Sequence, residues 1–258
     1  MLKFNARTTK LLENAYLGAD FSRRRRASFE ALCPRPGDRI ADIGCGNGLL
    51  TQELARTLGE TGKVFGIDPS DNMRKAAHQR CSDLPNVEIL DGTANTLGLE
   101  SNSVDRAVSL QMFEYLDDLQ SAAVEAHRVL KPGGRLVVGD MHWDTLTWFS
   151  DYPERMHKML VAWDRHLIER CVPAVLPPIL QTAGFVVEQV TPVPFSATGL
   201  HPDGLPNMMI NLMVPFVIEK DLVPEEEARE WALEQKKLDA SGRMFFSITH
   251  FVIVARKT

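Results

Sequence analysis

Two groups of residues in this sequence have types and spacing that suit chemistry. The first is the glycine-rich loop Gly44-Cys-Gly-Asn-Gly48, which follows the short apolar run Arg39–Ile43. This run predicts a buried parallel strand, and the glycines let the backbone turn sharply and bring a ligand against bare amides. Because residues 49–58 have helical spacing, the loop should lead into a helix N-terminus, where unpaired N–H groups favour a carboxylate or a phosphate.

Asp68 adds a hydrogen-bond acceptor twenty residues after Gly48, the last residue of this loop. It closes the apolar run Val64-Phe-Gly-Ile-Asp68, which predicts a second strand. A carboxylate at the end of that strand could accept hydrogen bonds from both hydroxyls of a ribose. A glycine triplet alone often marks a tight turn without a ligand, and the aspartate at this offset is what favours a nucleotide-cofactor site.

The second group is Asp140, His142 and Asp144, which alternate onto one side of the chain if this stretch is extended. Three interpretations remain open. His142 could be a general base whose ring is oriented by an aspartate. The carboxylates could bind a divalent metal ion. Alternatively, these are loop residues, with Asp144 as the N-cap of a helix over 145–150.

Aromatic residues and a second acid/base pair surround this segment. Trp143, Trp148, Phe149 and Trp163 could wall a pocket or pack in the core. Asp164 and His166 could belong to the same pocket, although a helical surface is the expected place for them. The cysteines Cys33, Cys45, Cys81 and Cys171 form no Cys-x-x-Cys pair, so their spacing predicts neither a zinc site nor any other metal site.

The overall composition is that of an ordinary soluble globular protein. The chain has 258 residues, of which 44% are hydrophobic and 24% charged, with a formal net charge of −5. This balance does not point to nucleic acid or to an anionic membrane as a partner. No apolar run is long enough to span a bilayer, and the first residues do not resemble a secretory signal, so we expect a cytoplasmic protein with reduced cysteines.

Strand and helix patterns alternate through most of the chain. Such alternation predicts an α/β fold with a mostly parallel, Rossmann-like sheet of seven strands, helices on both faces and a ligand at the carboxyl ends of the strands. The expected helices lie near 48–59, 70–81 and 118–130. The expected strands are 39–43, 63–67, 86–90, 104–109, 135–140, 184–190 and 245–254.

Two regions stand outside this alternation. Residues 1–36 predict an N-terminal helical cap, with two helices over 8–33 that separate at Gly18. We expect Arg23–Arg26 to be a solvated basic turn, from which one arginine, or Tyr16, could close over a cofactor. The rest of the chain, 37–258, is the second domain, with an insertion or lid at about 192–243. Its methionines suit core packing, or an adaptable pocket.

The order of three motifs resembles the class I S-adenosylmethionine-dependent methyltransferases, in particular the broad group that includes the ubiquinone and menaquinone C-methyltransferases. The first motif is Asp42-Ile-Gly-Cys-Gly-Asn-Gly48, and the second is Asp91-Gly-Thr-Ala94 with Ser103-Val-Asp105. The third is Leu130-Lys-Pro-Gly-Gly134. The resemblance covers about residues 36–142 well and the C-terminal part only in layout.

This resemblance implies S-adenosyl-L-methionine as the cofactor. Gly44, Cys45 and Gly46 would approach its methionine part, with Asp42 orienting the loop or the amino group. Asp68 would hold the ribose, and Ile67 or Pro69 would flank the adenine.

The resemblance further implies that Gly92, Thr93 and Ala94 lie at the adenine. The family usually has Gly-Asp-Ala there, so Thr93 offers a hydroxyl in place of a carboxylate. Gln111 falls where the family places a residue under the sulfonium. Glu114 and Tyr115 follow Gln111 and are further candidates for contact with an acceptor.

The expected function is therefore methylation of a small-molecule metabolite by in-line transfer, with C- or O-methylation favoured. Two alternatives remain. One is a nicotinamide-dependent oxidoreductase that uses the same glycine loop. The other is a methyltransferase-fold protein that binds the cofactor without transferring methyl. The sequence does not identify the acceptor or the oligomeric state.

Overall fold

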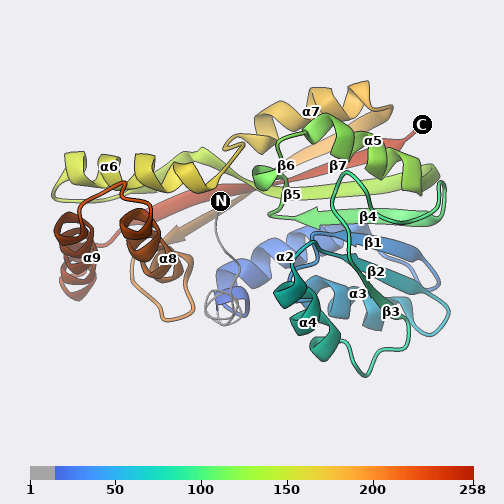
Figure 1. Cartoon of the computed structure of the whole chain (residues 1–258), viewed down its shortest axis with the longest axis horizontal. Helices are drawn as coiled ribbons and strands as arrows, with labels where there is room; N and C mark the ends of the chain where they lie inside the picture. Colours follow the sequence, from blue (N-terminus) through green and yellow to red (C-terminus); the bar gives the residue numbers. More distant parts are fainter. Residues whose placement is uncertain (1–14) are drawn as a thin grey trace.

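A twisted sheet of seven strands forms the centre of the computed structural model, which describes residues 15–258 (Figure 1). The strand order is β3-β2-β1-β4-β5-β7-β6. Strands β1 to β5 are parallel, and β7 pairs antiparallel with both β5 and β6. The predicted fold class is confirmed. The strands are β1 (Arg39–Ile43), β2 (Lys63–Ile67), β3 (Val87–Leu90), β4 (Val104–Leu110), β5 (Leu130–Trp148), β6 (Phe185–Ala197) and β7 (Phe246–Lys257).

Helices cover both faces of the parallel part, as Figure 1 shows. On one side lie α2 (Ala19–Leu32), α3 (Leu49–Leu58) and α4 (Asp71–Arg80), and on the other lie α5 (Leu119–Val129) and α7 (Val172–Thr182). Each layer buries its own apolar cluster against the sheet. Burial on both faces explains why the central strands have almost continuous apolar sequences.

Strand β5 is much longer than predicted. The prediction of a helix over 145–150 is wrong, because β5 continues to Trp148. Thr147 and Trp148 pair with Ser247 and Phe246 of β7. This stretch contains β-branched and aromatic residues, which favour a strand when a partner strand is available. Asp144 therefore lies within an extended strand and is not a helix N-cap.

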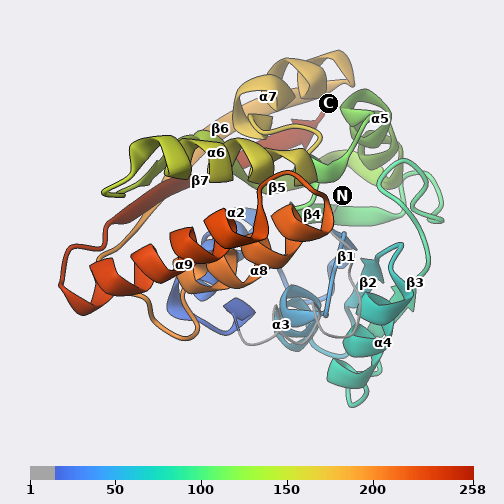
Figure 2. The same ribbon diagram turned by 60° about the vertical axis from the view of Figure 1, so that its left-hand side comes forward.

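The long ends of β5, β6 and β7 extend beyond the parallel strands and carry a second group of helices. These are α6 (Pro153–Trp163), α8 (Leu205–Glu219) and α9 (Glu225–Ala240), which gather around the extension in Figures 1 and 2. Trp231 of α9 is fully buried, with its ring 5.3 Å from that of Trp148. The insertion predicted for 192–243 thus contains α8 and α9, but residues 192–197 belong to β6.

The basic turn Arg23–Arg26 differs from its prediction. Arg24 and Arg25 are buried, at 2% and 9% exposure, whereas Arg23 and Arg26 are exposed. Four consecutive helical residues point in all directions, so Arg24 reaches Gln111 and Met141 at the sheet while Arg25 pairs with Glu53 of α3. The earlier part of the predicted N-terminal cap, residues 1–14, lies outside the described residues. Across residues 15–258, no helix combines the length and apolar character that crossing a membrane would require.

Candidate functional site

A cavity of about 410 Å³ lies at the carboxyl ends of the parallel strands. The loops that follow β1, β2, β3 and β4 form one wall, and residues of α2 and α8 line it from other sides. All the residues predicted to bind a cofactor line this one cavity, and they are Tyr16, Asp42, Gly44, Cys45, Gly46, Asp68, Pro69, Gly92, Thr93, Ala94 and Gln111. The structure therefore brings them together, and their roles towards the cofactor stay predictions.

The glycine loop is tied to the end of β2 by its own amides. The N–H groups of Gly44 and Cys45 both donate to the carbonyl oxygen of Ile67, at 2.8 and 3.0 Å. The N–H of Gly46 donates to Oδ2 of Asp68 at 2.9 Å. The prediction that these amides are bare is wrong, because parallel strands β1 and β2 end side by side and the loop satisfies its donors there.

The first two glycines of this loop, Gly44 and Gly46, are required for different reasons. Gly44 has φ +73°, and a Cβ on it would lie 2.5 Å from Cγ of Met112, so packing excludes a side chain. Gly46 has φ +54°, and a Cβ there would meet nothing within 4 Å. A side chain at 46 would therefore enter open space beside the cavity, which is where a ligand can approach the backbone.

Two buried carboxyl groups lie under the loop. Asp68 is 8% exposed, and its Oδ1 accepts from the N–H of Ser70 at 2.8 Å. Burial raises the pKa of Asp68, and the amides of Ser70 and Gly46 oppose that shift. Asp42 accepts from the hydroxyl of Thr51 at 2.6 Å, and burial raises its pKa to about 7. Asp42 thus joins β1 to α3, whereas each oxygen of Asp68 keeps a further lone pair for a ligand.

Asn47 is a cavity residue that the sequence analysis did not select. It is 3% exposed, and its Nδ2 has no hydrogen-bond partner within residues 15–258. A buried amide donor without a partner costs about 1–3 kcal/mol, so it favours a ligand that brings an acceptor such as a carboxylate. Its position between two glycines was the only sequence signal, and that signal was too weak to select it.

At the predicted adenine end of the cofactor site, the turn after β3 is held by backbone hydrogen bonds between Thr93 and Thr96. Thr93 lines the cavity with an exposed side chain. Asp91 does not line it, and its carboxylate lies 2.8 Å from the guanidinium of Arg74. Asp91 is therefore turned away from the cavity.

Gln111 is held in a strained conformation beside the cavity. Its φ is +52°, which is uncommon for a residue other than glycine. Its N–H donates to the carbonyl of Gly139 at 2.7 Å, and its Oε1 accepts from Arg24 at 2.7 Å. The buried arginine thus fixes the amide of Gln111, and such strain is typical of functional positions.

Glu114 brings an acidic group to the cavity wall. It lies in the short 3-10 helix η1 (Phe113–Tyr115), is 1% exposed, and accepts from Nε1 of Trp143 at 2.7 Å. Burial raises its pKa, while the hydrogen bond from Trp143 lowers it. A glutamate with a raised pKa is suited to proton transfer near neutral pH.

Asp140 lies beside Glu114 and has no exposure to solvent. Its Oδ1 accepts from the N–H of Met141 at 2.9 Å, while Oδ2 has no donor partner among the described residues. Burial raises its pKa well above the usual range, and the Glu114 carboxylate raises it further. Two adjacent buried carboxyls do not readily ionise together, so the protonated form of Asp140 is favoured beside the Glu114 carboxylate.

His142 and Asp144 are brought together, but away from Asp140. They contact Cys171, and neither they nor Asp140 are among the described residues that line the cavity. The neighbouring strand residues Met141 and Trp143 line it instead. A catalytic role for Asp140, His142 and Asp144 stays a prediction without support from contact with the cavity, and Glu114 is the better placed group.

Apolar residues line the rest of the cavity. Met208 and Met209 of α8 line it and also belong to an apolar cluster, so they combine core packing with a place beside the cavity, and an adaptable pocket stays a prediction. His166, in the 3-10 helix η2 (Asp164–His166), also lines the cavity and is 2% exposed, so its expected place on a helical surface is wrong. Its ring packs on Trp163, and burial lowers its pKa to about 4, which keeps it neutral.

A family model described as a methyltransferase domain matches residues 41–138, the region that contains the glycine loop, Asp68 and Gln111. A demethylmenaquinone methyltransferase of Desulfitobacterium hafniense is 36% identical over 129 residues, which are 49% of this chain and 51% of that protein. The matched segment, residues 41–138, is a methyltransferase domain, in agreement with the resemblance to the class I S-adenosylmethionine-dependent methyltransferases. S-Adenosylmethionine is the cofactor of this family.

A second relative and one solved structure extend the likeness beyond the matched domain. An uncharacterized 37.1 kDa protein in transposon TN4556 of Streptomyces fradiae is 34% identical over 240 residues, covering 89% of this chain and 66% of that protein. The chain thus spans from half to two thirds of these relatives. A methyltransferase structure from Aquifex aeolicus has a TM-score of 0.56 and 20% identity, and covers 96% of this chain and 99% of the other. It supports the fold.

The groups in the cavity fit this cofactor. Asp68 offers the acceptors that ribose hydroxyls need, and the unpartnered amide donor of Asn47 suits the cofactor's carboxylate. The open space at Gly46 leaves room for a ligand beside the loop. The acceptors of Asp68, the donor of Asn47 and the open space at Gly46 thus agree with S-adenosylmethionine as the ligand of this cavity.

Proposed function

We propose that the protein transfers a methyl group from S-adenosylmethionine to a small-molecule acceptor with an apolar or aromatic body. One observation carries this proposal: a single cavity joins the cofactor-type residues of the strand ends to apolar residues of α2, α6 and α8, and the Glu114 carboxylate lines the same cavity. The match to the methyltransferase domain supports the cofactor, and the composition of this apolar part supports the kind of acceptor.

The residues of the chain would mainly bind and orient. When bound, S-adenosylmethionine supplies an electrophilic methyl group. Asp68 would hold the ribose of the cofactor and Asn47 its carboxylate, and the Gln111 amide, fixed by Arg24, would lie near the sulfonium. Methyl transfer is a displacement, so holding the acceptor near the methyl carbon and in line supplies much of the rate enhancement.

Glu114 would accept the proton of an acceptor that arrives protonated. Unlike the buried Asp42 and Asp68, which adjoin the glycine loop, Glu114 lines the cavity at the end of β4, and the hydrogen bond from Trp143 fixes its orientation. The adjacent Asp140 would hold the proton shared by the pair, so Glu114 would be left ionised and able to act as a base. This arrangement suits a hydroxyl group or an activated carbon, which supports C- or O-methylation.

The N-terminal helix and the insertion would together form a lid. Tyr16 and Phe21 lie near the glycine loop, and Leu205, Met209 and Leu212 of α8 face the same cavity. Asp20 of α2 accepts from the N–H of Leu205 at 2.7 Å, so the two parts are joined. We propose that residues 1–36 and about 192–243 exclude water from a methyltransferase domain that occupies the rest of 37–258.

Binding and transfer should be tested separately. Calorimetric titration should show binding of S-adenosylmethionine and of its demethylated product, with NAD as the comparison ligand. Incubation with methyl-labelled cofactor and a panel of apolar phenols and quinols, set against polar amines and sugars, should label the apolar members. A matched Glu114→Gln protein separates base-assisted transfer from binding.

The outcomes are distinct. Binding of NAD without S-adenosylmethionine would refute the proposal and support the oxidoreductase alternative. Cofactor binding without label in any metabolite extract would support a protein that does not transfer methyl. Label confined to polar acceptors would keep the transferase activity and refute the proposed acceptor class.

A further inference from the structure

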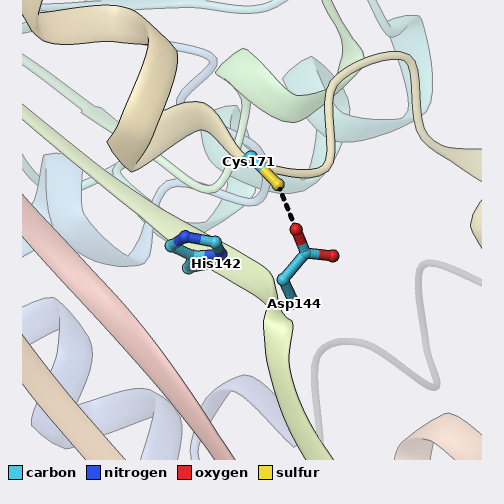
Figure 3. A group of neighbouring side chains, drawn as sticks. All are labelled: His142, Asp144 and Cys171. Atoms are coloured by element: carbon cyan, nitrogen blue, oxygen red, sulfur yellow. Dashed lines mark hydrogen bonds between the residues drawn. The ribbon is translucent and has the colours of Figure 1, made fainter.

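A compact group of metal-type ligands lies outside the cavity, on the far side of β5. His142 and Asp144 extend from β5, and Cys171 is the N-cap residue of α7 (Figure 3). One ligand atom from each lies within 4.8 Å of the other two. The three residues are not among the described residues that line the cavity, so this group is separate from the site of methyl transfer.

The side chains of this group make few hydrogen bonds and ion pairs, and one imidazole nitrogen makes none within the described residues. The thiol of Cys171 donates to Oδ2 of Asp144 at 2.9 Å, as Figure 3 shows. Oδ1 of Asp144 lies 2.9 Å from the guanidinium of Arg170. Nδ1 of His142 is buried and has no hydrogen-bond partner within residues 15–258. An imidazole with an unpaired nitrogen beside a thiol and a carboxylate lacks the partners expected of a purely structural contact.

The ligand types match one class of ion. Imidazole nitrogen, carboxylate oxygen and thiolate sulfur are the ligands of Zn²⁺, at about 2.0–2.3 Å. Ligand atoms around a tetrahedral ion of this size lie about 3–4 Å apart, so small side-chain rotations would close the group. Asp144 is exposed and His142 and Cys171 are half-buried, which leaves a path for an ion and a place for a water molecule.

We propose that His142, Asp144 and Cys171 bind one Zn²⁺-type divalent ion, with water as the fourth ligand. On binding, the Cys171 thiol loses its proton to solvent and a sulfur–metal bond replaces its hydrogen bond to Asp144. Arg170 keeps the other carboxylate oxygen. No oxidation or reduction is involved.

The position of the site gives the ion a structural role. The N–H of Trp143, between the two β5 ligands, donates to the carbonyl of Arg170 at 3.0 Å. Trp143 lines the cavity and donates to Glu114, while the carbonyl of Glu114 accepts from the amides of Ile168 and Glu169. An ion here would cross-link β5 to the segment before α7 and so brace the cavity wall that carries Glu114.

The test uses the whole chain after chelator treatment, with Zn²⁺ alone as the calorimetric titrant and Co²⁺ as the spectroscopic probe. We expect one ion per chain, release of a proton on binding, and a thiolate-to-Co²⁺ absorption band. Cys171→Ser should abolish that band, and Cys171→Ser and His142→Gln should each weaken Zn²⁺ binding by at least about tenfold, since even partners outside the first ligand set are worth about 10–100-fold.

Cys33→Ser is the matched control, because Cys33 is an exposed free cysteine at the end of α2. It should leave both binding and the absorption band unchanged. Protection of Cys171 from alkylation by Zn²⁺ in the unmodified protein gives a measurement that needs no variant. Absence of stoichiometric Zn²⁺ binding, an unchanged affinity in both ligand variants, or no protection of Cys171 would overturn the proposal.

Discussion

Replacing Asp68 with asparagine directly tests the prediction that Asp68 binds the ribose of the cofactor. The two carboxylate oxygens accept from the amides of Gly46 and Ser70 at 2.9 and 2.8 Å. Asparagine keeps one acceptor oxygen, but its NH₂ group would face the second amide as donor against donor. The variant thus loses a charge-assisted hydrogen bond in the protein and one acceptor for a ribose hydroxyl.

The size of the effect follows from these contacts. A hydrogen bond to a charged group is worth about 1.5–3 kcal/mol, so the free energy of unfolding without ligand should fall by about that amount. Affinity for S-adenosylmethionine should fall by about 1–3 kcal/mol, or about 5- to 150-fold in Kd. Denaturant unfolding measures the first quantity and calorimetric titration measures the second.

Asp91→Asn is the control for Asp68→Asn. Asp91 lies near the same end of the sheet, but its exposed carboxylate pairs with Arg74 and does not line the cavity. Exposed ion pairs contribute about 0–1 kcal/mol, so this variant should bind the cofactor with unchanged affinity. Equal cofactor affinity in Asp68→Asn and the unmodified protein would refute the assignment of Asp68 to the ribose.

Four further predictions concern the acids and the loop. Glu114→Gln should lower turnover by about 10²–10⁴-fold with cofactor affinity preserved, and an unchanged single-turnover rate would exclude Glu114 as the base. Asp140 binds its proton more tightly in the folded than in the unfolded chain. The free energy of unfolding of the unmodified protein therefore falls as the pH rises above about 4, which is the pKa of an aspartate in the unfolded chain. Asp140→Asn should therefore gain unfolding free energy relative to the unmodified protein between pH 5 and pH 8, and a difference that is constant with pH would contradict the shared proton. Gly46→Ala should fold but bind S-adenosylmethionine weakly, because its methyl group enters open space beside the cavity. Gly44→Ala should instead lower the melting temperature, because its methyl group would overlap Met112, and the opposite ranking of the two variants would show that the loop is misassigned.

The sequence predicts the parallel part of this fold well, because burial on both faces makes its strands apolar and short helices alternate with them. It predicts the extension poorly. The stretch that ends at Trp148 is a strand only because β7 lies beside it, and β7 is about a hundred residues away in sequence. A local pattern of an aspartate before Thr145 resembles a helix start, and long-range pairing overrides it.

The meeting of the expected cofactor residues in one cavity could be predicted for a related reason. Gly44, Gly46 and Asp68 belong to loops whose position is fixed by the ends of neighbouring parallel strands, so their order in sequence implies their meeting in space. Asn47 gave little signal because its importance depends on a missing partner, which only the packed structure reveals.

The two sides of β5 show most clearly what a sequence pattern leaves undecided. Alternation separates residues 140, 142 and 144 from 141 and 143, but it does not say which set meets the cavity. The structure turns Met141 and Trp143 to the cavity and leaves His142 and Asp144 to meet Cys171, whose thiol is 27 residues distant in the chain. The hydrogen bond from Trp143 to Glu114 is the reason that we propose Glu114, and not His142, as the acid/base group. Neighbouring residues of one strand would then support two proposed sites, the cavity through Met141 and Trp143 and the metal site through His142 and Asp144.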